Sequence, residues 1–188
     1  MKKIRNTIME IFPFWLALAV VISFLSGFIY VSVQQTLRQD ANDPQIQVAE
    51  DLANQLSQAS KLPTLNTVID IKKSLATFVI IFNNKGKPVT STAYLDNSIP
   101  VPPIGVFQLA EKFKKNLITW QPQNNVRIAS VIVPFGNKSG FILVGRSLRE
   151  VEKRIDKITL FAVVTWMGAV FGSLVILILN KLLINKFF

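Results

Sequence analysis

Few residues of the types that carry out chemistry occur in this sequence of 188 residues. It contains no Cys and no His, which excludes a thiol nucleophile, an imidazole base, a Cys/His zinc site and a disulfide. Two carboxylate pairs, Asp40 with Asp43 and Glu150 with Glu152, lie at expected helix starts, where the helix dipole explains them. The sequence has no Gly-rich phosphate loop and no nucleophile elbow. We therefore expect no enzymatic activity, no metal site and no cofactor.

The charge of the chain is strongly positive, with a formal net charge of +10. Nucleic-acid binding is one function that such a charge favours. Here the cations are scattered rather than arranged in a stripe, and no RNA- or DNA-binding motif accompanies them. Anionic lipid headgroups are a simpler partner for the lysines near both ends of the sequence. We therefore expect a lipid bilayer, and no nucleic acid, as a partner.

Two uncharged apolar blocks raise the mean hydropathy of the chain to +0.39. The first is Ile11–Val33, and about 20 apolar residues suffice to cross a bilayer as a helix. Lys2, Lys3 and Arg5 precede it, a pattern also typical of a cleaved signal peptide. The block is longer than the apolar part of a usual signal peptide, and no A-x-A-like cleavage site follows it. We therefore predict an uncleaved transmembrane helix over residues 11–34.

The second apolar block, Ile158–Leu179, is also free of charge and long enough to span a bilayer. Lys181 and Lys186 follow it, so both short tails carry positive side chains. The positive-inside rule then puts both tails in the cytoplasm and the long middle segment outside it. The predicted layout has tails over residues 1–10 and 180–188, membrane spans over 11–34 and 158–179, and an extracytoplasmic domain over 35–157.

Both predicted spans carry small residues at four-residue spacing, which allows helix backbones to approach closely in lipid. The first span has Ala19, Ser23 and Gly27, and the second has Gly168 and Gly172 in a G-x-x-x-G pattern. These five are the candidate helix–helix packing residues. The pattern leaves open whether the two spans pair with each other or with a second copy of the chain.

The segment between the spans mixes helical and strand patterns. Asp43 and Pro44 are typical of a helix start, with Asp43 as the N-cap, and the helical spacing that follows ends before Lys61. The run Phe78–Phe82 is rich in β-formers and predicts a buried strand. The other expected elements are short helices over 68–76 and 105–115 and strands over 87–94, 117–121, 126–135 and 141–145. Together they predict an α+β domain with an antiparallel sheet of about five strands and helices on one face.

The segment Ser147-Leu148-Arg149-Glu150 has the S-x-x-E pattern of a capping box. In that motif the Ser hydroxyl and the Glu carboxylate bond to free backbone amides at a helix start. From Leu148 to Gly172, apolar or small residues recur every three or four positions. One helix is therefore expected to run from the end of the domain into the second span, where it can transmit a shift or a rotation. The same stripe is also typical of a helix that merely packs against a neighbour.

Two segments carry a resemblance to a known family. Residues 78–89 (FVIIFNNKGKPV) are similar to a strand–turn–strand that opens a sheet, and residues 140–152 (GFILVGRSLREVE) to a last strand that leads into a signalling helix. In this arrangement the domain resembles the extracytoplasmic PAS-like (Cache-type) sensor domains of bacterial membrane-bound histidine kinases and chemoreceptors. The resemblance covers roughly residues 31–157 with the flanking spans. The sequence departs from the kinases because it has no phosphoacceptor His and no ATP-binding region after the second span.

The resemblance implies a place for a ligand, between the sheet and the helices that cross it. Candidate ligand-binding residues there are Tyr94, Trp120, Arg127 and Arg146. An Arg can hold a carboxylate through two parallel hydrogen bonds, and an aromatic ring can line a pocket. Each also has an ordinary structural explanation: Trp120 as a core aromatic, Arg127 as a solvated residue on an apolar strand, and Arg146 as the partner of a nearby carboxylate.

The function expected from these features is that of a membrane-anchored extracytoplasmic sensing or interaction protein. It has no catalytic output of its own, and it signals through a membrane protein partner or as an oligomer such as a homodimer. Two alternatives remain, a structural accessory subunit of a larger membrane complex and a detached sensor portion of a kinase. The expected location is the bacterial cell (inner) membrane, with two passes and both termini cytoplasmic.

Overall fold

The computed structural model describes residues 2–40, 42–58 and 67–187 and divides into two compact units. One unit is Met1–Thr36 with Arg154–Phe188, and the other is Leu37–Lys153. Each unit is described by itself. The elements are α1 (Lys2–Asp40), α2 (Asp43–Gln58), β1 (Ile69–Asp70), β2 (Phe78–Asn83), β3 (Pro88–Ser91), β4 (Ala93–Tyr94), α3 (Gly105–Phe113), β5 (Asn116–Gln123), β6 (Val126–Phe135), β7 (Gly140–Ser147) and α4 (Arg149–Phe187).

The 37–153 unit is built on a five-stranded sheet in the order β3-β2-β7-β6-β5. Every neighbouring pair in this sheet is antiparallel. The α+β class and the five-stranded antiparallel sheet are therefore confirmed. A second, two-stranded sheet joins β1 to β4 in parallel. The last strand of the chain, β7, lies in the middle of the large sheet, where it pairs with β2 on one side and β6 on the other.

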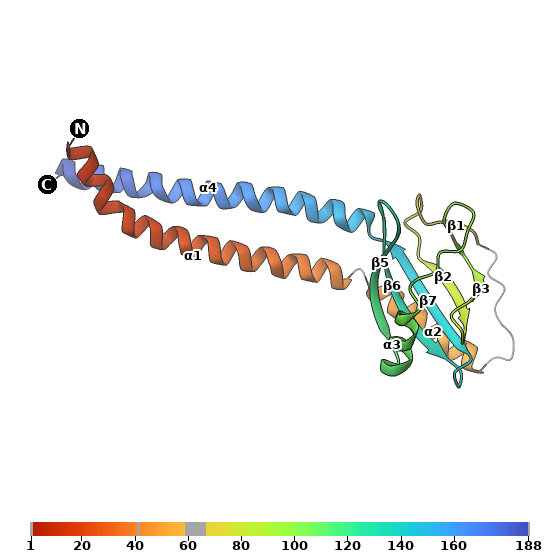
Figure 1. The fold of residues 1–188 in the computed structure, drawn as a ribbon. Helices are drawn as coiled ribbons and strands as arrows, with labels where there is room; N and C mark the ends of the chain where they lie inside the picture. The colour runs from red at the N-terminus through yellow and green to blue at the C-terminus, as the bar shows by residue number, and fades with distance from the viewer. Residues whose placement is uncertain (1, 41, 59–66, 188) are drawn as a thin grey trace. The chain divides into compact units, whose positions relative to one another are not determined.

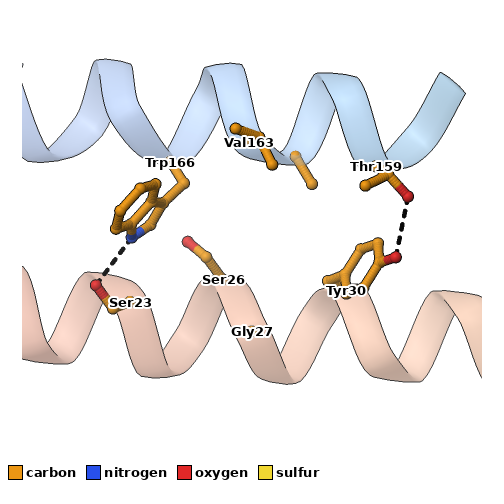
Figure 2. A pocket seen from close by; sticks show the side chains of 8 residues that line it. Ser23, Ser26, Gly27, Tyr30, Thr159, Val163 and Trp166 are labelled. Atoms are coloured by element: carbon orange, nitrogen blue, oxygen red, sulfur yellow. Dashed lines mark hydrogen bonds between the residues drawn. The ribbon is translucent and has the colours of Figure 1, made fainter. Parts of the chain in front are cut away.

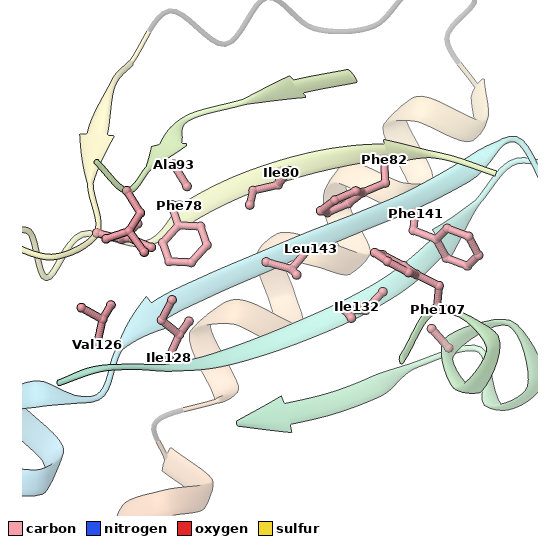
Figure 3. Packing of buried hydrophobic residues seen from close by; sticks show 13 residues of the cluster. Phe78, Ile80, Phe82, Ala93, Phe107, Val126, Ile128, Ile132, Phe141 and Leu143 are labelled. Carbon is pink, nitrogen blue, oxygen red and sulfur yellow. The ribbon is translucent and has the colours of Figure 1, made fainter. Parts of the chain in front are cut away.

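The large sheet is covered on both faces, not on one as the sequence predicted. Helix α2 packs on one face, where Ala49 and Ala53 meet alternate residues of β6 and β7 such as Val131 and Val144. On the other face, Phe107 of α3 lies between the rings of Phe82 and Phe141, at 4.9 and 5.2 Å between ring centroids (Figure 3). This double burial explains why β2, β6 and β7 have continuous apolar runs instead of an alternating pattern.

The helix expected over 68–76 is wrong, because this segment forms β1 followed by turns. Pairing with Ala93 of β4 holds the backbone of Ile69 in an extended conformation. The Asp70 carboxylate then accepts a hydrogen bond from the backbone amide of Lys72 at 3.0 Å, a local bond that competes with helix formation. The expected strand over 87–94 is also interrupted, because the Thr92 hydroxyl bonds to the backbone of Val79 between β3 and β4. The predicted helix end at Lys61 lies outside the described residues.

Two predicted helix starts are shifted by one residue. The first hydrogen bond of α2 joins the amide of Ile46 to the carbonyl of Asn42, so Asn42, and not Asp43, is the flanking residue. Helix α4 begins with a bond from the amide of Glu152 to the carbonyl of Leu148. Ser147 is the last residue of β7, and its hydroxyl accepts a bond from the amide of Arg149 at 3.4 Å.

The other unit is a pair of long helices that lie side by side (Figure 1). Helices α1 and α4 each contain 39 residues. Each has a stretch long and apolar enough to cross a membrane, by length and composition. Large apolar side chains along both helices are exposed, among them Phe24 at 74% and Phe161 at 68%. Helix α4 continues without a break from Arg149 to Phe187, as the spacing of its apolar residues predicts.

One substitution tests the packing of the large sheet. An alanine Cβ at Gly140 would press against the backbone carbonyl oxygen of Phe82, which cannot move away as a flexible side chain could. We expect Gly140→Ala to lower the free energy of unfolding by about 2 kcal/mol. Gly105→Ala is the matched control, because a Cβ there meets nothing within 4 Å. Denaturant titration of the detergent-solubilised chain, followed by circular dichroism, measures both. Equal stability of the two variants would contradict this packing.

Candidate functional site

The place where β7 passes into α4 is held by hydrogen bonds to two other parts of the 37–153 unit. The backbone amide of Leu148 donates to the carbonyl of Arg127 at 2.9 Å. The Arg127 guanidinium in turn donates from Nη1 to Oε1 of Glu152 at 2.7 Å. Strand β6 therefore holds the first turn of α4 through one backbone bond and one ion pair. Both charged side chains are partly exposed, so solvent screens this pair.

A second set of contacts ties the same helix start to the loop after β1. Arg149 donates from Nη1 to the carbonyl of Lys72 at 3.3 Å and from Nη2 to the carbonyl of Lys73 at 3.1 Å. Arg146, near the end of β7, donates from Nε to the carbonyl of Leu75 at 3.2 Å. Two guanidinium groups thus hold three carbonyls of one short loop, which uses the fixed donor geometry of Arg.

The local sequence of the loop presents these carbonyls. Asp70 ends β1, and its backbone carbonyl accepts the amides of both Lys73 and Ser74. Its carboxylate accepts the amide of Lys72. The Ser74 hydroxyl then accepts the amide of Ala76 at 3.1 Å. Four amides of this segment are therefore bonded within it, and three of its carbonyls accept from the two arginines.

The four candidate ligand residues do not form one group. Arg127 and Arg146 both lie at the α4 junction, where each has a protein partner. Trp120 packs against the core on the α3 face, and its indole N–H donates to the Ser130 hydroxyl at 3.0 Å. Tyr94 is in β4, opposite Asp70. The sequence interpretation missed the contacts of Arg149, because this residue occupies an unspecified position of the S-x-x-E pattern.

The helix pair has polar contacts of its own, made by large side chains. The Trp166 indole donates to the Ser23 hydroxyl at 2.8 Å, and the Tyr30 and Thr159 hydroxyls are 2.9 Å apart (Figure 2). The Trp15 indole donates to the backbone carbonyl of Val170 at 3.1 Å. The Thr159 hydroxyl also donates to its own helix, at the carbonyl of Ile155. Tyr30 is therefore the donor to Thr159, so α1 donates at Trp15 and Tyr30 and α4 donates at Trp166.

A groove of about 300 Å³ lies between the two side-chain bridges of Figure 2. Of the five candidate packing residues, Ser23 and Gly27 line this groove. An added Cβ at Gly27, Gly168 or Gly172 would meet nothing within 4 Å, so these glycines do not create close contact within this helix pair. Ala19 is half-buried and Gly168 is exposed. Whether these residues pack against a second copy stays a prediction.

Comparison with protein-family models, with curated proteins and with solved structures gave no match to this chain. The residues that the structure describes hold no group of three or more Asp or Glu side chains arranged for a metal ion. The contacts observed at the α4 junction are hydrogen bonds and an ion pair between a loop, a strand and a helix.

The arginine contacts lead to a prediction for the loop. Arg149→Ala removes two charge-assisted bonds, so the amides of residues 72–77 should exchange hydrogen about three- to tenfold faster. Lys153→Ala is the matched control, because the Lys153 ammonium reaches only along its own helix, to Glu150 at 3.0 Å. Hydrogen exchange followed by mass spectrometry gives both rates. The role given to Arg149 is wrong if the two variants exchange alike in this loop.

The indole–hydroxyl bridge leads to a second prediction. Trp166→Phe keeps an aromatic ring and removes the N–H, and Ser23→Ala removes the acceptor. A double-mutant cycle should give a coupling of about 1 kcal/mol in the unfolding of the helix pair in detergent. The same cycle for Trp166 with Ala19, which has no such bond, should give a value near zero. A zero coupling for the first pair would contradict the bridge.

Proposed function

We propose that this chain is a two-pass membrane protein with a PAS-like extracytoplasmic domain that senses a ligand or binds a partner. It has no catalytic step of its own and passes its signal through α4 to a membrane protein partner or a second copy. The observation that carries the proposal is the start of α4. This unbroken helix is held at its first turn both by β6 and by the carbonyls of Lys72 and Lys73.

The exposed side chains of α1 and α4 support the membrane part of the proposal. Contiguous large apolar side chains along two 39-residue helices are exposed in this chain. Such a surface is costly in water and is satisfied by hydrocarbon. Hydrogen bonds between the helices, such as Trp166 to Ser23, also satisfy polar groups that lipid cannot.

The sheet supports the PAS-like part. Counted within the sheet alone, its strands stand in the order 2-1-5-4-3, so the opening hairpin and the last strand meet near the centre. The resemblance rests on these same two segments, residues 78–89 and 140–152. Helices cover both faces, which provides the boundary between sheet and helix where such domains bind ligands.

The junction also supports a route for the signal. The loop carbonyls of Lys72, Lys73 and Leu75 compete with water and with any incoming group for Arg146 and Arg149. A ligand or partner that moves this loop changes the contacts that hold the first turn of α4. The partly exposed pairs contribute little to stability, so such a change needs only a few kcal/mol of differential binding.

The location can be tested with single cysteines, because the chain has none of its own. Asn97→Cys is in an exposed turn of the 37–153 unit, and Ile184→Cys is near the far end of α4. In intact cells, we expect a membrane-impermeant maleimide to label the first variant, whereas the second reacts only after the cells are opened. The chain should also stay in the membrane fraction after alkaline carbonate extraction. Release by carbonate, or labelling of Ile184→Cys in intact cells, would overturn the topology.

Sensing can be tested on the detergent-solubilised full chain by a thermal-shift screen against small metabolites. A compound that binds the native state should raise the melting temperature further as its concentration exceeds Kd, because the stabilisation grows with the logarithm of concentration over Kd. Arg149→Ala should retain the shift but lose the ligand-dependent change in hydrogen exchange at the start of α4. A failed screen together with recovery of the chain in a stoichiometric complex would favour the accessory-subunit alternative.

A further inference from the structure

A second cleft lies between α1 and α4, toward the residues near both ends of the chain. It has a volume of about 390 Å³ and is lined by Glu10, Phe14 and neighbouring residues of α1 and by Leu177, Lys181 and Ile184 of α4. Unlike the groove of Figure 2, which apolar and hydroxyl side chains line, this cleft contains one full charge of each sign.

The two charges are paired and still accessible. Lys181 Nζ is 2.9 Å from Glu10 Oε2, and the side chains are 35% and 61% exposed. An ammonium has three N–H donors and a carboxylate has about four lone-pair sites, so the pair leaves donors and acceptors available. Asn180 adds an amide to the same lining. The cleft therefore offers a cation for a phosphate and an anion for an ammonium at one place.

The remaining wall of the cleft is apolar. Phe14 is 70% exposed and Ile184 49% exposed, and Leu177 lines the cleft beside them. A ligand that uses all of these features combines a phosphate, an N–H-bearing cation and hydrocarbon. A phospholipid with a primary-amine headgroup has these three parts. A glycerol headgroup lacks the cation, and a quaternary choline headgroup lacks the N–H that the Glu10 carboxylate would accept.

We propose that this cleft binds one phosphatidylethanolamine-type lipid, with Lys181 on the phosphate, Glu10 on the ammonium and Phe14 and Leu177 along an acyl chain. The inference rests on the proposed membrane location of α1 and α4. The net charge of Glu10 and Lys181 together is zero, and this favours a zwitterionic lipid over an anionic one at this site.

Native mass spectrometry of the detergent-solubilised full chain, titrated with one lipid at a time, tests the proposal. The wild type should retain the ethanolamine lipid about tenfold better than the glycerol or choline lipid with the same acyl chains. Glu10→Gln should abolish this preference, and Lys181→Ala should lower retention of all three lipids. Lys181→Arg should restore retention, because it keeps the cation. Lys153→Ala changes a cation of α4 outside the cleft and should behave as the wild type.

Three outcomes would overturn the proposal. One is equal retention of the three lipids by the wild type, and another is a preference that survives Glu10→Gln. The third is displacement of the lipid by water-soluble phosphoethanolamine at equal concentration, which would identify a free phosphate compound as the occupant.

Circular dichroism of each variant should match the wild type. If Lys181→Ala does not fold, Glu10→Gln alone provides the test. A chain that carbonate releases from membranes refutes the proposed function, whereas an integral chain with no lipid preference refutes only this inference.

Discussion

The pairing of β7 with β2 and β6 is the constraint on which the rest of the 37–153 unit depends. The last strand in sequence lies inside the sheet, so the sheet closes only when the chain returns to the opening hairpin. Both faces of β7 are then covered, by α2 on one side and by α3 with the β1–β4 sheet on the other. Because β7 runs directly into α4, the strand fixed most completely by its neighbours also sets where the long helix begins.

The start of α4 is fixed by weaker and more adjustable contacts. Ion pairs and guanidinium–carbonyl bonds on a partly exposed surface contribute little stability each. Their value is in geometry, because they connect β6 and the 72–75 loop to a single helical turn. A rigid strand that enters a helix held by exchangeable bonds is a reasonable arrangement for a device that responds to binding. The proposal of a sensing or interaction function rests on this contrast.

The helix pair follows a different rule from the one that the small residues suggested. Large polar side chains, Trp15, Tyr30 and Trp166, bridge α1 and α4 and leave grooves between the bridges. Gly168 and Gly172 have open space where a Cβ would be. In hydrocarbon a bridge of this kind is favourable because an unpaired N–H or hydroxyl has no water to replace the bond. Small residues at this spacing permit another helix to approach closely, but they do not specify which helix packs there.

The sequence by itself determined the parts whose physics is local. Uncharged runs of more than 20 residues determine long apolar helices, and the β-forming runs at Phe78–Phe82 and Val126–Phe135 determine strands. The α+β class and the continuity of α4 follow from the same patterns. Only the tertiary structure decided the features that depend on residues distant in the sequence. Residues 69–70 became a strand because β4 was available, and Arg149 acquired its role because the 72–75 loop is within reach. Periodicity records which face of an element is buried, whereas a hydrogen bond between residues 76 apart depends on where the whole sheet places them.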